Sequence, residues 1–216
     1  MERYCAIIPD RGDRPELTDH CFRMIDRMFR KPDKLYHVNH KPNTSGFDLV
    51  DRVFRGASMA RQDGFDWCFI IENDDYYPSN YFDRFTPYLD KYDFLGDEKS
   101  TYYNLQNLTF RTFEHKCRSS LFTTAFRISA LNNFEWPDDS TTFLDIDLWK
   151  YARFKRRKFI DTGAVGIKHG LGLCGGKGHK FNMPNHDYNL EWLEAHTDEM
   201  SFRFYKGMIE KLKVRV

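Results

Sequence analysis

Charge of one sign and long apolar segments are both missing from this 216-residue sequence. Its 33 Lys and Arg residues oppose 32 Asp and Glu residues, which leaves a formal net charge of +1. Such a balance supplies no general field that would steer the protein onto nucleic acid. No segment approaches the roughly 20 apolar residues that a membrane-spanning helix needs. We therefore expect no membrane span, and since residues 1–10 resemble a strand more than a secretory signal, we expect a cytoplasmic protein.

Paired cysteines are missing as well. The five cysteines occur singly, without a C-x-x-C pair, and an odd number at irregular spacing fits neither a disulfide framework nor a zinc site. Free cysteines commonly fill apolar cores. We expect reduced and mostly buried thiols at Cys5, Cys21, Cys68, Cys117 and Cys174.

The sequence does contain a regular alternation of strand and helix patterns in its first 80 residues. Short apolar runs at 4–9, 34–40 and 66–71 predict strands, and residues 16–29 and 47–64 repeat apolar residues at helical spacing. This order predicts a parallel sheet with helices on its faces, where ligands bind beyond the carboxyl ends of the strands. We expect one mixed α/β domain over residues 1–216, built on a Rossmann-like mixed sheet flanked by helices, with a nucleotide-binding half at 1–80.

The second half, 81–216, has a less regular pattern. Residues 78–89 and 143–155 and the segment from Asn189 onward have helical patterns, and 92–97 reads as a short strand. Residues 100–115 alternate polar and apolar residues as a hairpin does, 120–131 can continue the sheet into a short helix, and 158–170 contains a late strand.

An acidic run, Glu72-Asn73-Asp74-Asp75, follows the strand predicted at 66–71. Carboxylates crowded at a strand end repel one another, so they are tolerated if they are well solvated or if a hard divalent cation neutralises them. Mg²⁺ and Mn²⁺ take oxygen ligands and commonly share them with substrate phosphates. The alternative is an acidic turn that begins the next helix, with Asp75 or Ser79 as its cap.

Two further segments carry polar residues beyond predicted strands. In the first, Pro9 and Gly12 end a strand, so that a loop at the carboxyl edge of the sheet presents groups for a base and ribose; the alternative is a solvated turn. In the second, five glycines lie between His169 and His179, and the backbone N–H groups of such a loop can approach phosphate oxygens. No Walker pattern is present. The candidate nucleotide contacts are Pro9, Asp10, Arg11 and Arg14 in the first segment and Lys168, Gly175, Gly176 and Lys177 in the second.

These segments, in this order, resemble GT-A glycosyltransferases of the family 2 type, including small viral members such as those of chlorella viruses and bacteriophages. The resemblance covers "IPDRGDRPEL", "GASMARQDG" and "ENDDYYP" and returns at "FLDIDLW" and "IKHGLGLCGGKGH". It implies a Mn²⁺ or Mg²⁺ ion that bridges the two phosphates of a nucleotide-sugar. Asn73 stands where many relatives have Asp. The location for a viral member would be the host cytoplasm.

The same resemblance assigns individual roles. Asp75 is the first choice as metal ligand and Asp74 the second, Glu72 or Asn73 contacts ribose or metal-bound water, and a histidine, His169 before His179, completes the metal shell. Asn39 and Arg61 match positions that face the base or the diphosphate. Aligning on Leu148-Trp149 places Asp145 where family 2 enzymes carry the general base, with Asp147 as the alternative. Read without the resemblance, Asp145 caps a helix and Asp147 lies in its first turn.

The resemblance implies a metal-dependent glycosyltransferase that moves a hexose from a UDP-sugar, first of all UDP-glucose, to an acceptor hydroxyl with inversion. A retaining mechanism stays open. The acceptor is a glycan, a protein or a modified DNA base, and we expect residues 100–110, Trp136 and Trp149 to shape its side of the site because aromatic faces suit sugar rings. The alternatives are a sugar nucleotidyltransferase and a catalytically inactive protein that binds a sugar or nucleotide.

Overall fold

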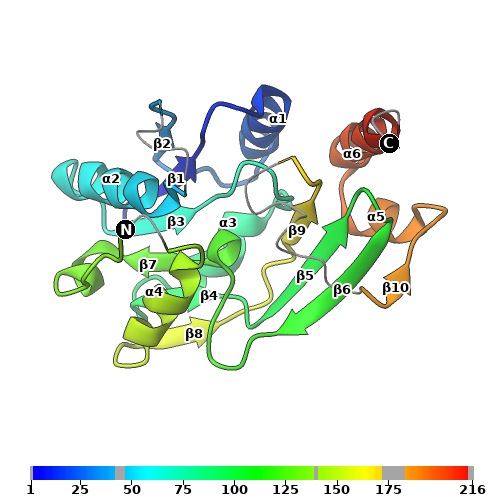
Figure 1. Cartoon of the computed structure of the whole chain (residues 1–216). Helices are drawn as coiled ribbons and strands as arrows, with labels where there is room; N and C mark the ends of the chain where they lie inside the picture. The colour runs from blue at the N-terminus through cyan, green and yellow to red at the C-terminus, as the bar shows by residue number, and fades with distance from the viewer. Residues whose placement is uncertain (1, 42–46, 139–140, 172–182, 214–216) are drawn as a thin grey trace.

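The computed structural model describes residues 2–41, 47–138, 141–171 and 183–213, and it shows two adjoining β-sheets with helices packed against them (Figure 1). The six-stranded sheet has the order β2-β1-β3-β7-β4-β8, and the four-stranded sheet has the order β10-β6-β5-β9. Strands of the first sheet are β1 (Tyr4–Pro9), β2 (Lys34–Val38), β3 (Trp67–Ile70), β4 (Phe94–Gly96), β7 (Ala125–Arg127) and β8 (Arg157–Phe159). Strands of the second are β5 (Lys99–Asn104), β6 (Thr109–Glu114), β9 (Val165–Lys168) and β10 (Asn185–His186).

Six α-helices are present in the described part of the chain. They are α1 (Pro15–Asp26), α2 (Leu49–Gln62), α3 (Tyr81–Phe85), α4 (Leu144–Ala152), α5 (Glu191–His196) and α6 (Glu199–Lys213). Three short 3₁₀ helices, η1 (Thr86–Tyr88), η2 (Leu121–Thr123) and η3 (Ile128–Leu131), complete the elements. The expected single mixed α/β domain is confirmed. None of these helices combines the length and the apolar character that a membrane crossing requires.

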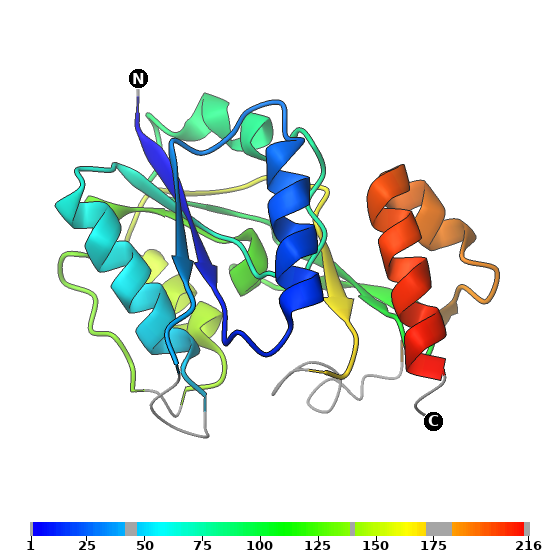
Figure 2. The ribbon, with the colours of Figure 1, turned by 90° about the horizontal axis from the view of Figure 1, so that it is seen from above.

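The alternation of side chains along the central strands divides the core between the two faces of the six-stranded sheet. In β1, Cys5 and Ile7 face the cluster that contains α2 and α4, while Tyr4, Ala6 and Ile8 face the cluster that contains α1 and α3. Figure 2 shows β1 and β2 lying between α1 and α2. Helices on both faces explain why these strands are apolar throughout instead of alternating with polar residues.

The predicted order of elements agrees with the structure as far as β3, and later segments depart from it. The segment predicted to contain one late strand holds β8 and β9, β10 was not predicted, and the helical end is divided into α5 and α6. The helix expected at 78–89 is divided into α3 and η1, because Pro87 has no N–H to donate to a continuing α-helix. Strands β1, β2 and β3 are parallel, as the alternating pattern predicts. The sheet as a whole is mixed, as expected, since β7 pairs antiparallel with both β3 and β4. Cys5, Cys21 and Cys68 are buried free thiols as expected, but Cys117 is exposed, and Cys174 lies outside the described residues.

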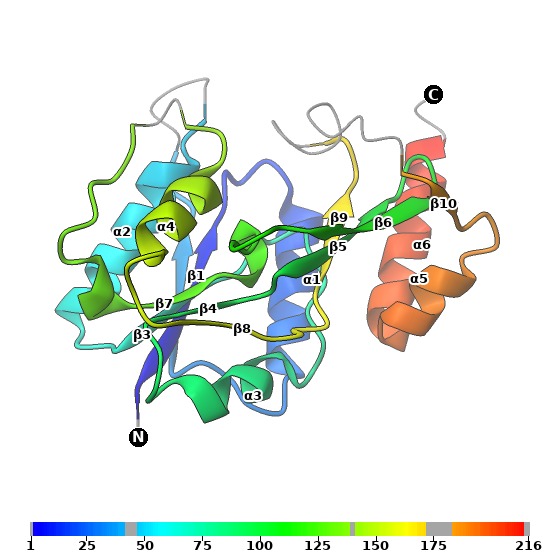
Figure 3. The ribbon, with the colours of Figure 1, turned by 90° about the horizontal axis from the view of Figure 1, so that it is seen from below.

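The two sheets meet at the carboxyl end of β3. There Tyr76 and Val165 exchange two backbone hydrogen bonds, Tyr76 N to Val165 O at 2.9 Å and Val165 N to Tyr76 O at 3.0 Å. Strand β9 then runs parallel to β5 into the second sheet, as the view from below shows (Figure 3). The carboxyl end of β3 and strand β9 thus lie side by side.

The C-terminal helix α6 packs beside α1 (Figure 2). The ring of His20 in α1 is stacked on Phe204 with 3.9 Å between centroids, and Lys211 Nζ donates to Glu16 Oε2 at 2.6 Å. Burial lowers the pKa of His20 to about 4, with Arg23 adding to this effect. Since α1 begins directly after Arg14, α6 supports the element that carries this arginine.

The close packing of α2 on β1 predicts a contrast between two glycines. An added Cβ at Gly56 would lie 2.5 Å from Cγ2 of Ile7, whereas one at Gly207 in α6 would meet no atom within 4 Å. We expect Gly56→Ala to lower the free energy of unfolding by about 1–3 kcal/mol through overpacking. Gly207→Ala should raise it by about 0.5–1 kcal/mol through helix propensity. Urea denaturation checks both, and equal effects of the two substitutions would contradict this packing.

Candidate functional site

A cleft of about 390 Å³ opens at the junction of the two sheets. Its walls come from the end of β3, from β5 and β9, from the segment after β6, and from the start of α4. The polar residues that line it are Glu72, Tyr102, His115, Arg118, Ser120, Thr142, Asp145 and Lys168. Three sequence-predicted residues from separate segments, Glu72, Asp145 and Lys168, therefore line one cleft.

Glu72 is the acidic residue of the run 72–75 that lines this cleft. Its pKa is raised to about 7, chiefly by burial and further by the neighbouring negative charge of Asp74, while Lys168 acts in the opposite direction. Asp145 also raises it. No hydrogen bond or ion pair joins the Glu72 carboxylate to the described residues. This carboxylate is available to a ligand.

Asp74 is held by two basic residues. Arg14 Nη1 donates to Asp74 Oδ2 in a short ion pair, and His169 Nε2 lies 3.0 Å from the same oxygen. Burial raises the pKa of Asp74, but Arg14 and the His169 hydrogen bond outweigh this and hold the pKa well below its usual range. Asp74 is therefore ionised and already paired.

The hydrogen bonds of His169 define its tautomer. Leu171 N donates to His169 Nδ1 at 3.0 Å, so Nδ1 carries no proton, and a neutral ring then carries its proton on Nε2. This proton is donated to Asp74 Oδ2. Because both ring nitrogens are used, His169, which is 0% exposed, has no lone pair to offer a metal ion in this arrangement.

Asp75 and Asn73 face inward. Asp75 is 1% exposed and its Oδ1 accepts from Ile167 N in β9 at 2.7 Å. Burial raises the pKa of Asp75 well above its usual value, although Lys168 opposes this. Asn73 donates from Nδ2 to Thr18 Oγ1 at 2.7 Å and accepts from Arg14 Nη2 at 3.3 Å. The order of preference that the sequence suggested, with Asp75 first, is at odds with this geometry because Glu72 is the acidic residue facing the cleft.

The two candidate bases, Asp145 and Asp147, project from α4 into different pockets. Asp145 lies in the first turn of this helix, lines the cleft and is 7% exposed. Arg118 Nη1 donates to its Oδ2. Burial raises the pKa of Asp145, while Arg118 lowers it to a smaller extent. Asp147 lines a different pocket with Asn133 and Tyr151, so it is misplaced for a base in this cleft. Phe143 occupies the N-cap position.

Lys168 is the last residue of β9 and supplies a cation to the cleft. Its backbone is fixed by the pairing of β9 with β5 and by the hydrogen bond from Leu105 N to Lys168 O at 2.8 Å. Nζ lies 5.0 Å from the centroid of the Tyr102 ring. Among the residues that the structure describes, no carboxylate oxygen lies within 4.0 Å of this ammonium group. Lys168 is therefore positioned to meet an anionic ligand.

The polar residues of the loop after β1 make more hydrogen bonds and ion pairs within the protein than the sequence indicated. Asp10 is 3% exposed and accepts from Gly12 N at 2.8 Å, from Thr18 Oγ1 at 3.0 Å and from His37 Nε2 at 2.8 Å. Burial raises the pKa of Asp10, but these hydrogen bonds outweigh burial and hold its pKa below the usual value. Arg11 pairs with Asp48 at 3.0 Å. Asp10 therefore shapes the loop and has little capacity left to bind ribose.

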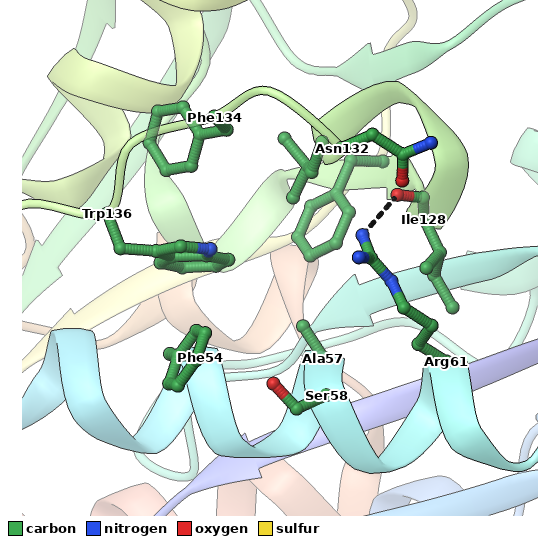
Figure 4. Close-up of a pocket in the computed structure, with 10 residues that line it drawn as sticks. Phe54, Ala57, Ser58, Arg61, Ile128, Asn132, Phe134 and Trp136 are labelled. Carbon is green, nitrogen blue, oxygen red and sulfur yellow. Dashed lines mark hydrogen bonds between the residues drawn. The ribbon is translucent and has the colours of Figure 1, made fainter.

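The remaining candidates for the nucleotide site do not all lie at the carboxyl edge of the sheet. Pro9 ends β1 and is buried, and Asn39 follows β2 as an exposed residue at the same carboxyl edge. Arg61 contradicts the expectation, because α2 runs back to the opposite edge of the sheet, where Arg61 Nη2 donates to Ile128 O at 3.2 Å (Figure 4). The candidates Gly175, Gly176, Lys177 and His179 lie outside the described residues.

The aromatic residues that we expected on the acceptor side of the site lie in different parts of the molecule. Trp149 is 1% exposed and donates to Thr124 Oγ1 at 2.9 Å, so it belongs to the core. Trp136 lies with Phe54 and Phe134 at a separate pocket of about 210 Å³ beside Arg61 (Figure 4). Tyr102 does line the cleft. Of the aromatic residues expected to shape the acceptor side, Tyr102 is therefore the one whose position agrees.

Sequence reasoning missed a hydrogen-bonded chain on the cleft wall. Tyr102 Oη lies 2.6 Å from Ser120 Oγ, which lies 3.0 Å from His115 Nε2. Burial, with Arg118 nearby, lowers the pKa of His115 to about 4, so the ring is neutral near pH 7. The polar run "EHKCRSS" after the predicted hairpin was the available signal, but its distance in sequence from the other motifs hid the connection.

A divalent metal ion would find few open oxygens here. Asp74 is paired with Arg14 and His169, Asp75 binds a backbone N–H of β9, and Asn73 binds Arg14 and Thr18. Within residues 2–41, 47–138, 141–171 and 183–213, no three His, Cys, Asp or Glu side chains converge in a way that could hold a metal ion. The described donor set does not fit a metal site.

Comparison with known proteins identifies the fold. The sequence matches no protein-family model and no curated protein. The structure is similar to A197 from STIV, a viral protein, with a TM-score of 0.50 and 12% identity over 74% of this chain and 82% of A197. It is also similar to residues 1–349 of S. aureus TarS, with a TM-score of 0.51 and 11% identity over 76% of this chain. TarS in complex with UDP gives a TM-score of 0.50 at 11% identity.

The match to TarS spans 60% of its residues 1–349, so the chain corresponds to part of that protein. A197 and TarS share the GT-A type of fold. At these identities the likeness is one of fold. The chain therefore has the GT-A fold, in which the acidic run follows β3 and the candidate base begins α4.

The hydrogen bonds of Asp10 predict a pH-dependent contribution to stability. Asp10→Asn should lower the free energy of unfolding by about 1–3 kcal/mol at pH 7, because Nδ2 cannot accept from its neighbours. The pKa of Asp10 is lower in the folded protein, so its contribution is complete above about pH 4 and is lost as the pH falls through the folded-state pKa. Urea titrations should show the gap between wild type and variant closing below about pH 4. A constant gap would contradict the assignment.

Proposed function

We propose that this chain is a glycosyltransferase that moves a hexose from a UDP-sugar to an acceptor hydroxyl. The observation that carries the proposal is the cleft in which Glu72, Lys168 and Asp145 come together at the carboxyl edge of a GT-A fold. An anionic diphosphate has Lys168 as a partner, and an acceptor hydroxyl has Asp145 as a base. UDP is favoured as the nucleotide because the similar TarS structure contains it.

In the proposed reaction, Asp145 takes the proton of the acceptor hydroxyl while the hydroxyl oxygen attacks the anomeric carbon of the sugar. The bond from this carbon to the diphosphate oxygen breaks, and UDP leaves from the opposite face with inversion. Arg118 bonds Oδ2 of Asp145 and so fixes the orientation of the carboxylate. The pKa of Asp145, raised by burial, makes it a better base than an exposed carboxylate.

The acceptor class follows from the aromatic and hydroxyl-bearing wall of the cleft. Tyr102, Phe113 and Phe122 offer apolar faces, and Ser120 and Thr142 offer hydroxyl groups. Such a wall suits a sugar ring better than a charged polymer, so a glycan is preferred to a protein or a modified base as the acceptor. Incubation with a panel of UDP-hexoses and oligosaccharides, with released UDP as the readout, tests the proposal.

A second candidate, an inactive nucleotide-sugar-binding protein, is favoured by the Arg118–Asp145 ion pair. This pair opposes proton uptake by Asp145. UDP binding without UDP release from any UDP-sugar and acceptor would favour this candidate.

The assignment of the base predicts a contrast between two neighbouring carboxylates. Asp145→Asn should lower the transfer rate by about 10²- to 10⁴-fold, since a positioned general base contributes on this order. UDP affinity should change little. Asp147→Asn serves as the matched control and should be silent, because Asp147 faces another pocket. Transfer rates and calorimetric UDP affinities measure both, and loss of transfer in the control would move the base to Asp147.

The position of the Lys168 ammonium group in the cleft predicts that removing it lowers the affinity for the nucleotide. Lys168→Met should weaken UDP binding by about 10- to 100-fold, the usual range for losing a charged hydrogen bond. Lys158→Met is the control, since Lys158 is exposed on β8. Equal UDP affinities of the two variants in calorimetry would remove Lys168 from the donor site.

A further inference from the structure

The acidic run 72–75 has its own counter-charge in the folded protein. Arg14 pairs with Asp74 and also donates to Asn73 at 3.3 Å. The side chains of Arg14 and Asp74 are 15% and 16% exposed, so water screens the pair only partly. A guanidinium thus neutralises the carboxylate that a divalent cation would otherwise bind.

Arg14 is held in this position by its own segment. Pro15 begins α1, and Arg14 O accepts from Leu17 N at 3.1 Å and from Thr18 N at 3.2 Å. Asp13 lies 3.4 Å from Arg14 Nε. The backbone of Arg14 is therefore part of the start of a helix that is packed on the sheet, and its guanidinium is placed before any ligand arrives.

The other oxygens of the run leave little for a metal ion. Asp75 Oδ1 is bonded to β9, and Oδ2 is buried with no partner among the described residues. Glu72 supplies a single open carboxylate. Mg²⁺ takes six oxygen ligands and is commonly held by one or two carboxylates together with water and substrate phosphates. With Asp74 paired to Arg14, Glu72 alone is the lower limit of such a protein contribution. The charge of a diphosphate would instead meet Lys168, whose ammonium group lines the same cleft.

We propose that this protein binds its nucleotide-sugar without a divalent cation, with Arg14 in the place of the metal ion at Asp74 and Lys168 facing the diphosphate. This inference rests on the proposed function for the identity of the ligand. It also predicts a latent metal site: removing the guanidinium leaves His169 as the remaining partner of Asp74, so that Asp74 and Glu72 can bind Mn²⁺ together.

Two titrations test the inference. Calorimetry of wild-type protein with UDP should give dissociation constants in EDTA and in Mn²⁺ that agree within about threefold, which corresponds to about 0.7 kcal/mol. Electron paramagnetic resonance of free Mn²⁺, without nucleotide, should show no site in wild type with a dissociation constant below about 1 mM, the weak end of carboxylate sites. Arg14→Met should bind one Mn²⁺ per chain more tightly than that limit.

Controls keep the outcomes separate. The double variant Arg14→Met/Asp74→Asn buries no unpaired charge and should lose the acquired Mn²⁺ site. Arg30→Met, which removes an exposed pair with Asp83, should behave as wild type.

An affinity for UDP at least tenfold weaker in EDTA than in Mn²⁺, or a wild-type Mn²⁺ site, would overturn the inference. If Arg14→Met does not fold, the wild-type titrations decide alone. Absence of UDP binding in both conditions would instead overturn the UDP-sugar donor, and the Mn²⁺ titrations would still decide the role of Arg14.

Discussion

The pairing of Tyr76 with Val165 is the contact on which the geometry of the site depends. It joins the carboxyl end of β3 in one sheet to β9 in the other. The hydrogen bond from Ile167 N to Asp75 Oδ1 extends this junction by one more contact. Glu72 then belongs to one wall of the cleft and Lys168 to the other. A buried carboxylate is costly unless it is hydrogen-bonded, so the most buried acid of the run serves to join the sheets.

Pairing of opposite charges is the second principle of the site. Asp74 is paired with Arg14, Asp145 with Arg118, and Glu72 lies within the electrostatic influence of Lys168. Each of these three acids thus has a basic neighbour from a different segment of the chain. Acidic and basic groups therefore nearly balance at the site, as they do in the whole chain with its net charge of +1. A dianionic ligand would have to bind these basic groups in competition with their acidic partners.

The sequence was sufficient to predict the order of elements in the first half and the place of Glu72, because parallel strands bring their carboxyl ends to one edge. Asp145 was assigned through the resemblance to GT-A enzymes, since it lies on α4 and not at a strand end. The inward turn of Asp75 was not predictable, since it depends on a strand 92 residues later in the chain. The same applies to Arg118 and His115, which reach the cleft through the hairpin of β5 and β6. The misplacement of Arg61 was avoidable. A helix between two parallel strands runs opposite to them, so its C-terminal residues lie at the amino edge.

The packing of α6 on α1 also affects the burial of the acidic run 72–75. Tyr205 is 0% exposed, and its pKa is raised well above the usual value by burial and by the nearby charges of Asp75 and Asp74. Its hydroxyl has no hydrogen-bond partner among the described residues. This helix therefore keeps water away from the buried Asp75, and a looser contact between α6 and α1 would weaken the Arg14–Asp74 attraction by admitting more water.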